Sequence, residues 1–112
     1  MSLRGWWIDG RRKMARYRDA PSIMQKDKVC FLSGSTVALE AHHIFFGNGK
    51  RELSAKYGLW VWLRHDLHNE PPAGVHFNRE NNRMLQALTQ TVFEQTYPDL
   101  DFIKIFGRNY KS

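Results

Sequence analysis

Three stretches of the chain are rich in apolar residues and are typical of β-strands. Residues 28–36 form a short apolar stretch that ends in Ser-Gly-Ser, which favours a turn, and residues 37–46 follow as the returning strand. Together they predict a β-hairpin. Residues 59–63 alternate aliphatic and tryptophan side chains, which indicates a strand buried on at least one face. We expect Trp60 and Trp62 to belong to the core or to form a platform beside it.

A long helix is predicted after residue 78. Asn78 can cap its first turn, and Pro98 marks its end. The apolar stripe at helical spacing consists of Leu85, Leu88 and Val92. Residues 99–106 are typical of a second, short helix, which Gly107 stops.

Between the last predicted strand and the long helix, the chain cannot form one continuous helix. Pro71 and Pro72 stand between His68 and His76, and a proline inside a helix removes a hydrogen bond and clashes with the preceding turn. Residues 52–57 have room for one helical turn. The predicted order is arm, hairpin, loop, strand, histidine-bearing turn, helix and helix, which is an α+β domain.

Length and composition favour one domain without a membrane anchor. A chain of 112 residues supports one modest core. No apolar run approaches the roughly 20 residues that a membrane-spanning helix needs. Cys30 is the only cysteine, which excludes an internal disulfide and a cysteine-based zinc site. Basic residues interrupt the N-terminal region before a signal-peptide core can form, so we expect a cytoplasmic protein.

Positive charge is concentrated near the N-terminus. Up to Lys28 the chain has eight basic and three acidic residues, a net charge of +5 out of a formal +6 for the whole chain. We therefore divide it into a basic arm, residues 1–21, and a domain, residues 22–112. Cations interspersed with aromatic residues suit DNA, although Trp6 and Trp7 could equally dock on the core. The arm residues expected to contact DNA are Arg11, Arg12, Lys13, Arg16 and Arg18.

A glycine-rich turn offers a second candidate contact with phosphate. Residues 47–49 read Gly-Asn-Gly and are followed by Lys50 and Arg51. Turns of this kind expose backbone N–H groups, and the two cations would add to their attraction for an anion. We therefore add Lys50 and Arg51 to the predicted nucleic-acid contacts.

All five histidines fall within residues 42–76. Their positions are His42, His43, His65, His68 and His76. Histidine is the commonest metal ligand and the side chain that titrates nearest neutral pH. Scattered core histidines would rarely form an adjacent pair, a second pair and a fifth residue soon after. The grouping therefore predicts a functional site.

Several motifs follow one another in a fixed order from residue 41 to residue 110. They read Ala41-His42-His43-Ile44-Phe45-Phe46-Gly47, Ser54-Ala55-Lys56-Tyr57-Gly58-Leu59, Leu67-His68-Asn69, Gly74-Val75-His76-Phe77-Asn78 and Ile105-Phe106-Gly107-Arg108-Asn109-Tyr110. In this order they resemble the HNH endonuclease superfamily, and in particular small phage and prophage HNH-like proteins. The resemblance covers residues 22–110 and leaves the arm outside. It implies a ββα-metal (His-Me finger) core of hairpin, long loop, strand and helix, with a short C-terminal helix added.

The resemblance also implies an endonuclease that hydrolyses DNA with one divalent metal ion and a histidine general base. His43 matches the position of the base, and His42 and His68 match ligand positions. His76 is the best remaining ligand because it directly precedes the helix. His65 is a reserve ligand, since a helical turn would place it beside His68; otherwise it is a surface residue paired with a carboxylate. The implied ion is Mg²⁺, Mn²⁺, Zn²⁺ or Ni²⁺, and three histidines leave a position open for chemistry.

Two features depart from the family pattern. Many relatives hold a structural zinc ion on two Cys-x-x-Cys pairs. The matching positions here are Cys30, Ser33, Arg64 and Leu67. We therefore expect no structural zinc, with apolar packing around Phe31, Trp60 and Leu67 in its place. The middle Asn, which orients the base in relatives, has no clear match because Leu59 or Gly58 occupies that region.

Strand geometry sets a condition on the adjacent pair His42 and His43. Neighbours in a regular strand face opposite ways, so the two rings share a site only if the strand ends or bends there. The turn at Gly47 follows soon enough to allow this.

Two other classes of function remain open. One is a nucleic-acid-binding module that kept the fold and lost catalysis, which the missing Asn and the basic arm both allow. The other is a metal-stabilised interaction domain whose histidines close a four-ligand zinc site. DNA is the expected partner in the nuclease and binding interpretations. The resemblance to phage proteins adds packaging or recombination proteins as candidate partners, in the cytoplasm of a bacterial host, and no membrane.

Overall fold

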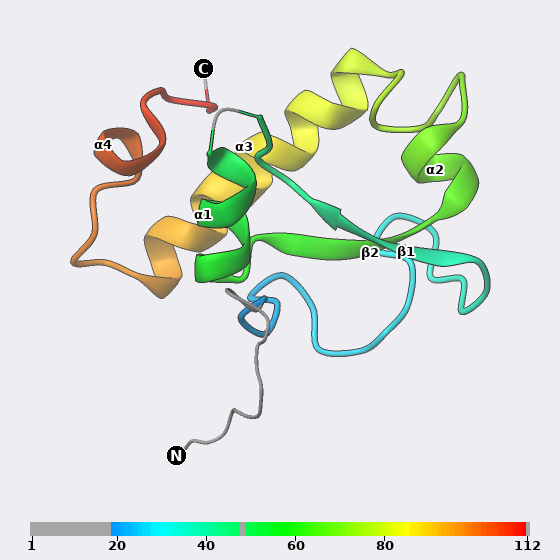
Figure 1. Ribbon diagram of the computed structural model, residues 1–112, viewed down its shortest axis with the longest axis horizontal. Coiled ribbons are helices and arrows are strands. Elements are labelled where there is room, and N and C mark those ends of the chain that lie inside the picture. Colours follow the sequence, from blue (N-terminus) through cyan, green and yellow to red (C-terminus); the bar gives the residue numbers. More distant parts are fainter. Residues whose placement is uncertain (1–18, 48, 112) are drawn as a thin grey trace.

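The computed structural model describes residues 19–47 and 49–111 (Figure 1). Within them the chain forms a small α+β fold with a two-stranded antiparallel sheet and four helices. None of these helices is long and apolar enough to cross a membrane. The predicted DNA contacts of the arm lie outside the described residues and stay predictions; they are Arg11, Arg12, Lys13, Arg16 and Arg18.

Two short strands form the centre of the fold. β1, Leu39–His43, pairs with β2, Trp60–Arg64, and the register places His42 opposite Val61. The pleat turns Val61 and Leu63 into the interior, where both are fully buried. The strand predicted at residues 59–63 is therefore confirmed, one residue later than expected.

The predicted hairpin of residues 28–36 with residues 37–46 is wrong. Residues 28–36 contain no strand, because the N–H of Cys30 donates to the carbonyl of Ser35 at 2.8 Å and closes a compact turn. The Phe31 N–H fastens this turn to a β2 carbonyl at 2.8 Å. β1 pairs instead with β2, a later strand whose inward side chains complete the core.

Two helices flank β2 in the sequence. α1, Lys50–Tyr57, precedes it and is longer than the single turn predicted for residues 52–57. Gly58 ends α1 with a φ of 73°, and a side chain there would collide with the carbonyl of Pro21, so glycine is required. α2, His65–Asn69, follows β2 without a connecting loop.

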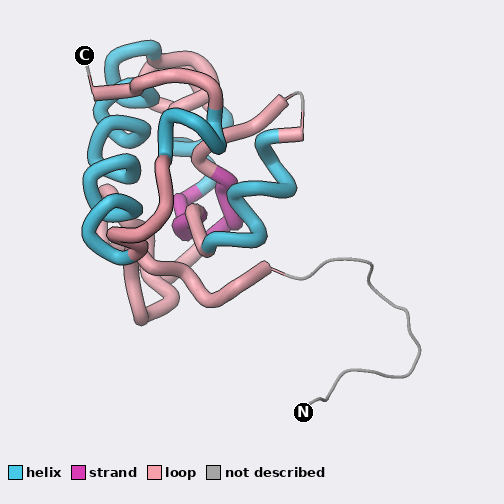
Figure 2. The backbone as a smooth tube through the Cα atoms, turned by 90° about the vertical axis from the view of Figure 1, so that its left-hand side faces the viewer, coloured by secondary structure: helices cyan, strands magenta, loops and turns pink. Residues whose placement is uncertain are grey.

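The long helix is α3, Arg79–Thr96. As predicted, Asn78 caps it: the side-chain oxygen accepts a hydrogen bond from the N–H of Asn81 at 2.8 Å. The helix ends before Pro98. Figure 2 shows the strand pair lying between α3 and α1.

The buried stripe of α3 differs from the predicted one. Leu85 faces the core as expected, but Leu88 is 43% exposed. The fully buried side chains of this helix are Leu85, Thr89, Gln90 and Phe93. Two polar residues therefore occupy inward positions, where their hydrogen bonds are made inside the protein.

α4, Phe102–Phe106, is shorter than the predicted helix at residues 99–106. Its N-cap is Asp101, and it ends at Gly107, as predicted. The rings of Phe102 and Phe106 stack on each other at 4.5 Å and join those of Phe45 and Phe93. This aromatic cluster fixes α4 against α3 and against the segment that follows β1.

Candidate metal centre

The loop after α2 folds back onto that helix and brings two histidines together. The chain leaves the helix before Pro71, as predicted, and the N–H of His76 then donates to the carbonyl of His68 at 3.3 Å. Gly74 makes the reversal possible, because a Cβ there would lie 2.5 Å from the carbonyl oxygen of Glu70. The backbone itself therefore places the imidazole of His76 beside that of His68.

Three histidines converge at one point, and we call them the histidine trio: His42 from β1, His68 from α2 and His76 from the loop before α3. One ring nitrogen of each lies within 4.8 Å of the others, close enough to hold one metal ion. The Nε2 atoms of His68 and His76 are 3.1 Å apart. Burial falls across the trio, since His42 is buried, His68 is half-buried and His76 is exposed. The trio is therefore anchored on the core and open to solvent on one side.

His42 carries a buried nitrogen, Nε2, with no hydrogen-bond partner in the described part of the chain. Burial, reinforced by the charges of His68, His76 and His43, lowers the pKa of His42 to about 3. The ring is therefore neutral near pH 7, which is the form that binds a metal.

A carboxylate orients the second ring of the trio. Glu40 lies 2.8 Å from Nδ1 of His68 and 2.7 Å from Nδ1 of His65. The hydrogen bond from His68, followed by that from His65, lowers the pKa of Glu40. Because Nδ1–H of His68 donates to this carboxylate, Nε2 keeps its lone pair and faces His76. Carboxylates hold metal-binding histidines in this way in known metal sites.

His65, the reserve ligand, lies outside the trio. Its ring is held between Glu40 at 2.7 Å and Glu70 at 3.0 Å, and it is about half exposed. The hydrogen bond to Glu40 is the main reason that the pKa of His65 is raised. A ring with carboxylates on both nitrogens has no lone pair to offer a metal. The alternative prediction, a surface histidine paired with a carboxylate, describes His65 correctly.

His43, the predicted base, is not part of the trio. It is buried at the end of β1, and its Nε2 lies 3.0 Å from Oδ1 of Asp19. The two adjacent histidines have separate partners, which is the arrangement of neighbours in a regular strand and differs from the shared site that the nuclease interpretation expected. His43 still lies near enough for its charge to act on the pKa of His42. Its role as a base stays a prediction.

Exposed aromatic side chains form the rim of the site. The ring of Phe46 lies 5.3 Å from that of His76 and is 42% exposed. Phe77, next to His76, is 60% exposed. The Phe46 ring therefore presents apolar surface beside the exposed His76.

The other predicted positions have partners of their own. Lys50 and Arg51 open α1, and the Nζ of Lys50 lies 3.4 Å from the hydroxyl of Tyr110. At one of the positions that match the family's Cys-x-x-Cys pairs, the buried Cys30 accepts a hydrogen bond from the N–H of Arg64 at 3.3 Å. The absence of a structural zinc stays a prediction, as does DNA contact by Lys50 and Arg51.

Sequence reasoning missed two carboxylates of the site. Glu40 had a usable signal, because it stands two residues before His42 on the same strand and therefore on the same face. Asp19 had none, since it reaches His43 across 24 residues of chain. Comparisons with protein-family models, curated proteins and solved structures find no match to this chain.

Proposed function

We propose that this chain is a metal-dependent endonuclease of the ββα-metal type, which hydrolyses DNA phosphodiester bonds. The observation that carries the proposal is the convergence of the trio around a buried nitrogen of His42 that has no hydrogen-bond partner among residues 19–47 and 49–111. A polar atom kept in this state costs about 1–3 kcal/mol, so a role in ligand binding explains its retention. The strand pair and the helix that begins just after His76 agree with the arrangement expected from the HNH resemblance.

The trio fits a divalent ion that accepts nitrogen ligands. Imidazole suits Zn²⁺ and Ni²⁺ among the expected ions, whereas Mg²⁺ prefers oxygen ligands. Three protein ligands leave at least one coordination position for the substrate. When bound, the ion would supply Lewis-acid stabilisation of charge on the phosphate and on the leaving oxygen. Glu40 would hold the His68 ring in the orientation that this site needs.

His43 is suited to the role of general base because of its contact with Asp19. If Nε2–H donates to that carboxylate, Nδ1 carries the lone pair and can take a proton from water. A carboxylate that fixes the tautomer of a catalytic imidazole plays the same part in Ser-His-Asp triads. Asp19 thus fills the orienting role for which the middle Asn of the motif has no match.

The test is plasmid cleavage by the purified chain with Zn²⁺, Ni²⁺, Mn²⁺ or Mg²⁺, and with chelator as the control. We expect cleavage that requires a metal ion and that falls at least ~100-fold in His43→Ala, the scale for losing a positioned base. Zinc affinity of that variant, measured by calorimetry, should be unchanged. DNA binding without metal-dependent cleavage would contradict the proposal and favour a binding module.

A double-mutant cycle tests Asp19 separately. Asp19→Ala should slow cleavage by about 10-fold or more, while Asp19→Asn, which keeps an acceptor, should slow it less. The double variant Asp19→Ala/His43→Ala should be no slower than His43→Ala alone, since residues that act as one unit are not additive. Additive losses would show that Asp19 acts on the fold and not through His43.

A further inference from the structure

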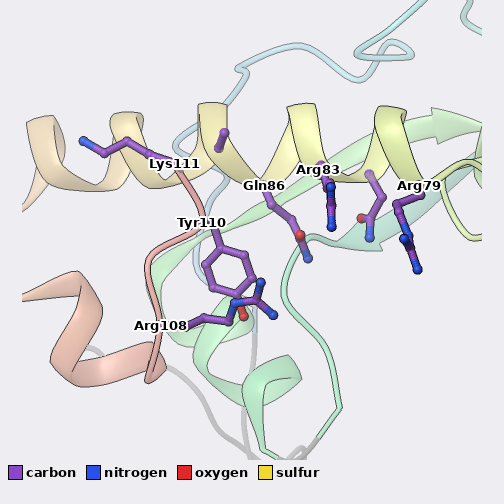
Figure 3. A pocket seen from close by; sticks show the side chains of 8 residues that line it. Arg79, Arg83, Gln86, Arg108, Tyr110 and Lys111 are labelled. Atoms are coloured by element: carbon purple, nitrogen blue, oxygen red, sulfur yellow. The ribbon is translucent and has the colours of Figure 1, made fainter.

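A basic groove lies between α3 and the C-terminal tail (Figure 3). Its cavity volume is about 530 Å³. The residues that matter for its chemistry are Arg79, Arg83 and Gln86 from α3 and Arg108, Tyr110 and Lys111 from the C-terminal tail. No acidic side chain lines it among the described residues. The charged side chains that line the groove are therefore all positive.

Three guanidinium groups give the groove its charge. Arg79 and Arg83 are four residues apart in α3, so they stand on the same side of the helix, as Figure 3 shows. Both are exposed, and neither has an ion-pair partner within residues 19–47 and 49–111. Arg108 lies over the ring of Tyr110, 4.7 Å from its centroid. Figure 3 shows these groups gathered on one side of α3.

Arg79 and Arg83 make no ion pair within the described residues, so they are not needed to hold the groove together. The tail is fixed by the N–H of Tyr110, which donates to Oε1 of the buried Gln90 at 2.7 Å. Lys111 is used elsewhere: it pairs with Glu94 at 2.6 Å and points away from Arg79 and Arg83 in Figure 3. Arg79 and Arg83 would repel each other in a free protein, and an anionic ligand removes that cost.

We propose that this groove binds the phosphodiester backbone of the DNA strand that the histidine trio acts on. Arginine suits this ligand because its planar fork can donate two hydrogen bonds to one phosphate. Arg79 stands three residues after His76, so the end of the groove at Arg79 is joined to the trio by a short piece of chain. The proposal rests on the proposed function for the identity of the strand, but the binding itself needs no metal.

The test is a binding titration of the full chain with a fluorescent DNA duplex and with its single strand, in chelator. Arg79→Gln/Arg83→Gln is compared with Lys26→Gln/Lys104→Gln, which removes the same charge from exposed positions outside the groove. The arginine variant should lose at least about 10-fold in affinity, and the slope of log K against log salt should shrink by about 2, the value for two lost phosphate contacts. The lysine control should keep the slope of the unchanged chain.

The outcomes separate this inference from the proposed function. The proposal is supported if the arginine variant, but not the lysine control, binds the duplex or the single strand more weakly. The form of DNA whose affinity falls more is the form that the groove binds. Equal losses in the two variants would overturn it, because net charge would then account for them. Zinc affinity and circular dichroism of the arginine variant should match the unchanged chain. Weaker DNA binding together with no metal-dependent cleavage by the unchanged chain would leave the groove standing and reject the nuclease.

Discussion

Two buried polar side chains, Gln90 in α3 and His42 in β1, have opposite surroundings. Gln90 accepts from the N–H of Tyr110 at 2.7 Å and donates to Asn109 at 3.0 Å and to Glu94 at 3.1 Å. His42 leaves its buried Nε2 without a partner among the described residues. Gln90 is fully buried and His42 is 2% exposed, so solvent does not account for the difference.

The comparison distinguishes a polar network whose hydrogen bonds are all made from a group of polar side chains with an unused buried nitrogen among the described residues. The Gln90 network is closed, since both ends of the amide are used, and it joins α3 to the C-terminal tail. Such a network adds stability and needs no ligand. At His42, the imidazoles of His68 and His76 lie close by, but Nε2 has no hydrogen-bond partner among the described residues. The three ring nitrogens lie close enough together to hold a metal ion, which is the ligand that we propose for the site.

The largest expected effect comes from removing the buried ligand. His42→Ala should lower zinc affinity at least ~100-fold, beyond the 10–100-fold typical of losing an outer partner of a ligand. Calorimetric titration with Zn²⁺ measures this, and His65→Ala is the control, because its ring lies outside the trio. A variant of His65 that loses zinc while His76→Ala retains it would mean that His65 and His68 form the site.

Breaking the closed network should affect stability and not metal binding. Gln90→Leu leaves the N–H of Tyr110 without its acceptor and removes the hydrogen bond that Gln90 donates to Asn109, at a cost of about 1–3 kcal/mol in the free energy of unfolding. Urea titration measures the loss. Zinc affinity of the folded variant should stay within about twofold of the original value, since Gln90 touches no member of the trio. A large loss of zinc affinity would mean that the two sites are coupled.

The carboxylate behind His68 should have an intermediate effect. Glu40→Gln removes the charge that fixes the His68 tautomer, so zinc affinity should fall about 10-fold. His65→Ala deletes the other partner of Glu40 and serves as the matched control, with little expected change. Equal zinc affinities for Glu40→Gln and the unchanged chain would show that the contact does not orient the ligand.

The smallest expected effect is on the pH dependence of the metal-free protein. Burial keeps the pKa of His42 at about 3 in the folded chain, whereas the ordinary histidine pKa is near 6.5. Between these two pH values, the unfolded chain binds a proton at His42 and the folded chain does not. This contribution to stability therefore falls as the pH drops from about 6.5 toward 3. Between pH 7 and pH 5.5 it amounts to about 1 kcal/mol. Urea titrations of the unchanged chain and of His42→Asn in chelator should differ by this slope, and parallel pH profiles would contradict it.

Local features of the fold were predictable, and long-range pairing was not. The cap at Asn78 and the stop at Gly107 follow from the side chain or backbone freedom of one residue, so they appear in the sequence itself. The apolar pattern of residues 28–36 imitates a strand, but its buried Cys30 closes a turn instead. The pairing of β1 with β2 depends on which side chains fill the core. Because α1 separates the two strands in the sequence, no local pattern indicates this pairing.

The candidate site shows the same division. The grouping of His42, His68 and His76 was visible from their residue type and from the loop that Pro71 imposes. The contact between Asp19 and His43 depends on how the N-terminal segment crosses the end of β1, for which no local pattern exists. The position of Glu40 could have been predicted, because residues two apart in a strand lie on the same face and Glu40 stands two residues before His42.

The central claim, that the trio binds a metal through ring nitrogens, is tested most directly by nitrogen NMR of the histidine rings during addition of Zn²⁺. Each ring reports separately whether one of its nitrogens has acquired a metal bond. We predict large shifts of Nε2 in His42, His68 and His76, with the His65 ring nearly unchanged. Metal-dependent shifts at His65 without His42, or no shift at any of the trio, would contradict the account.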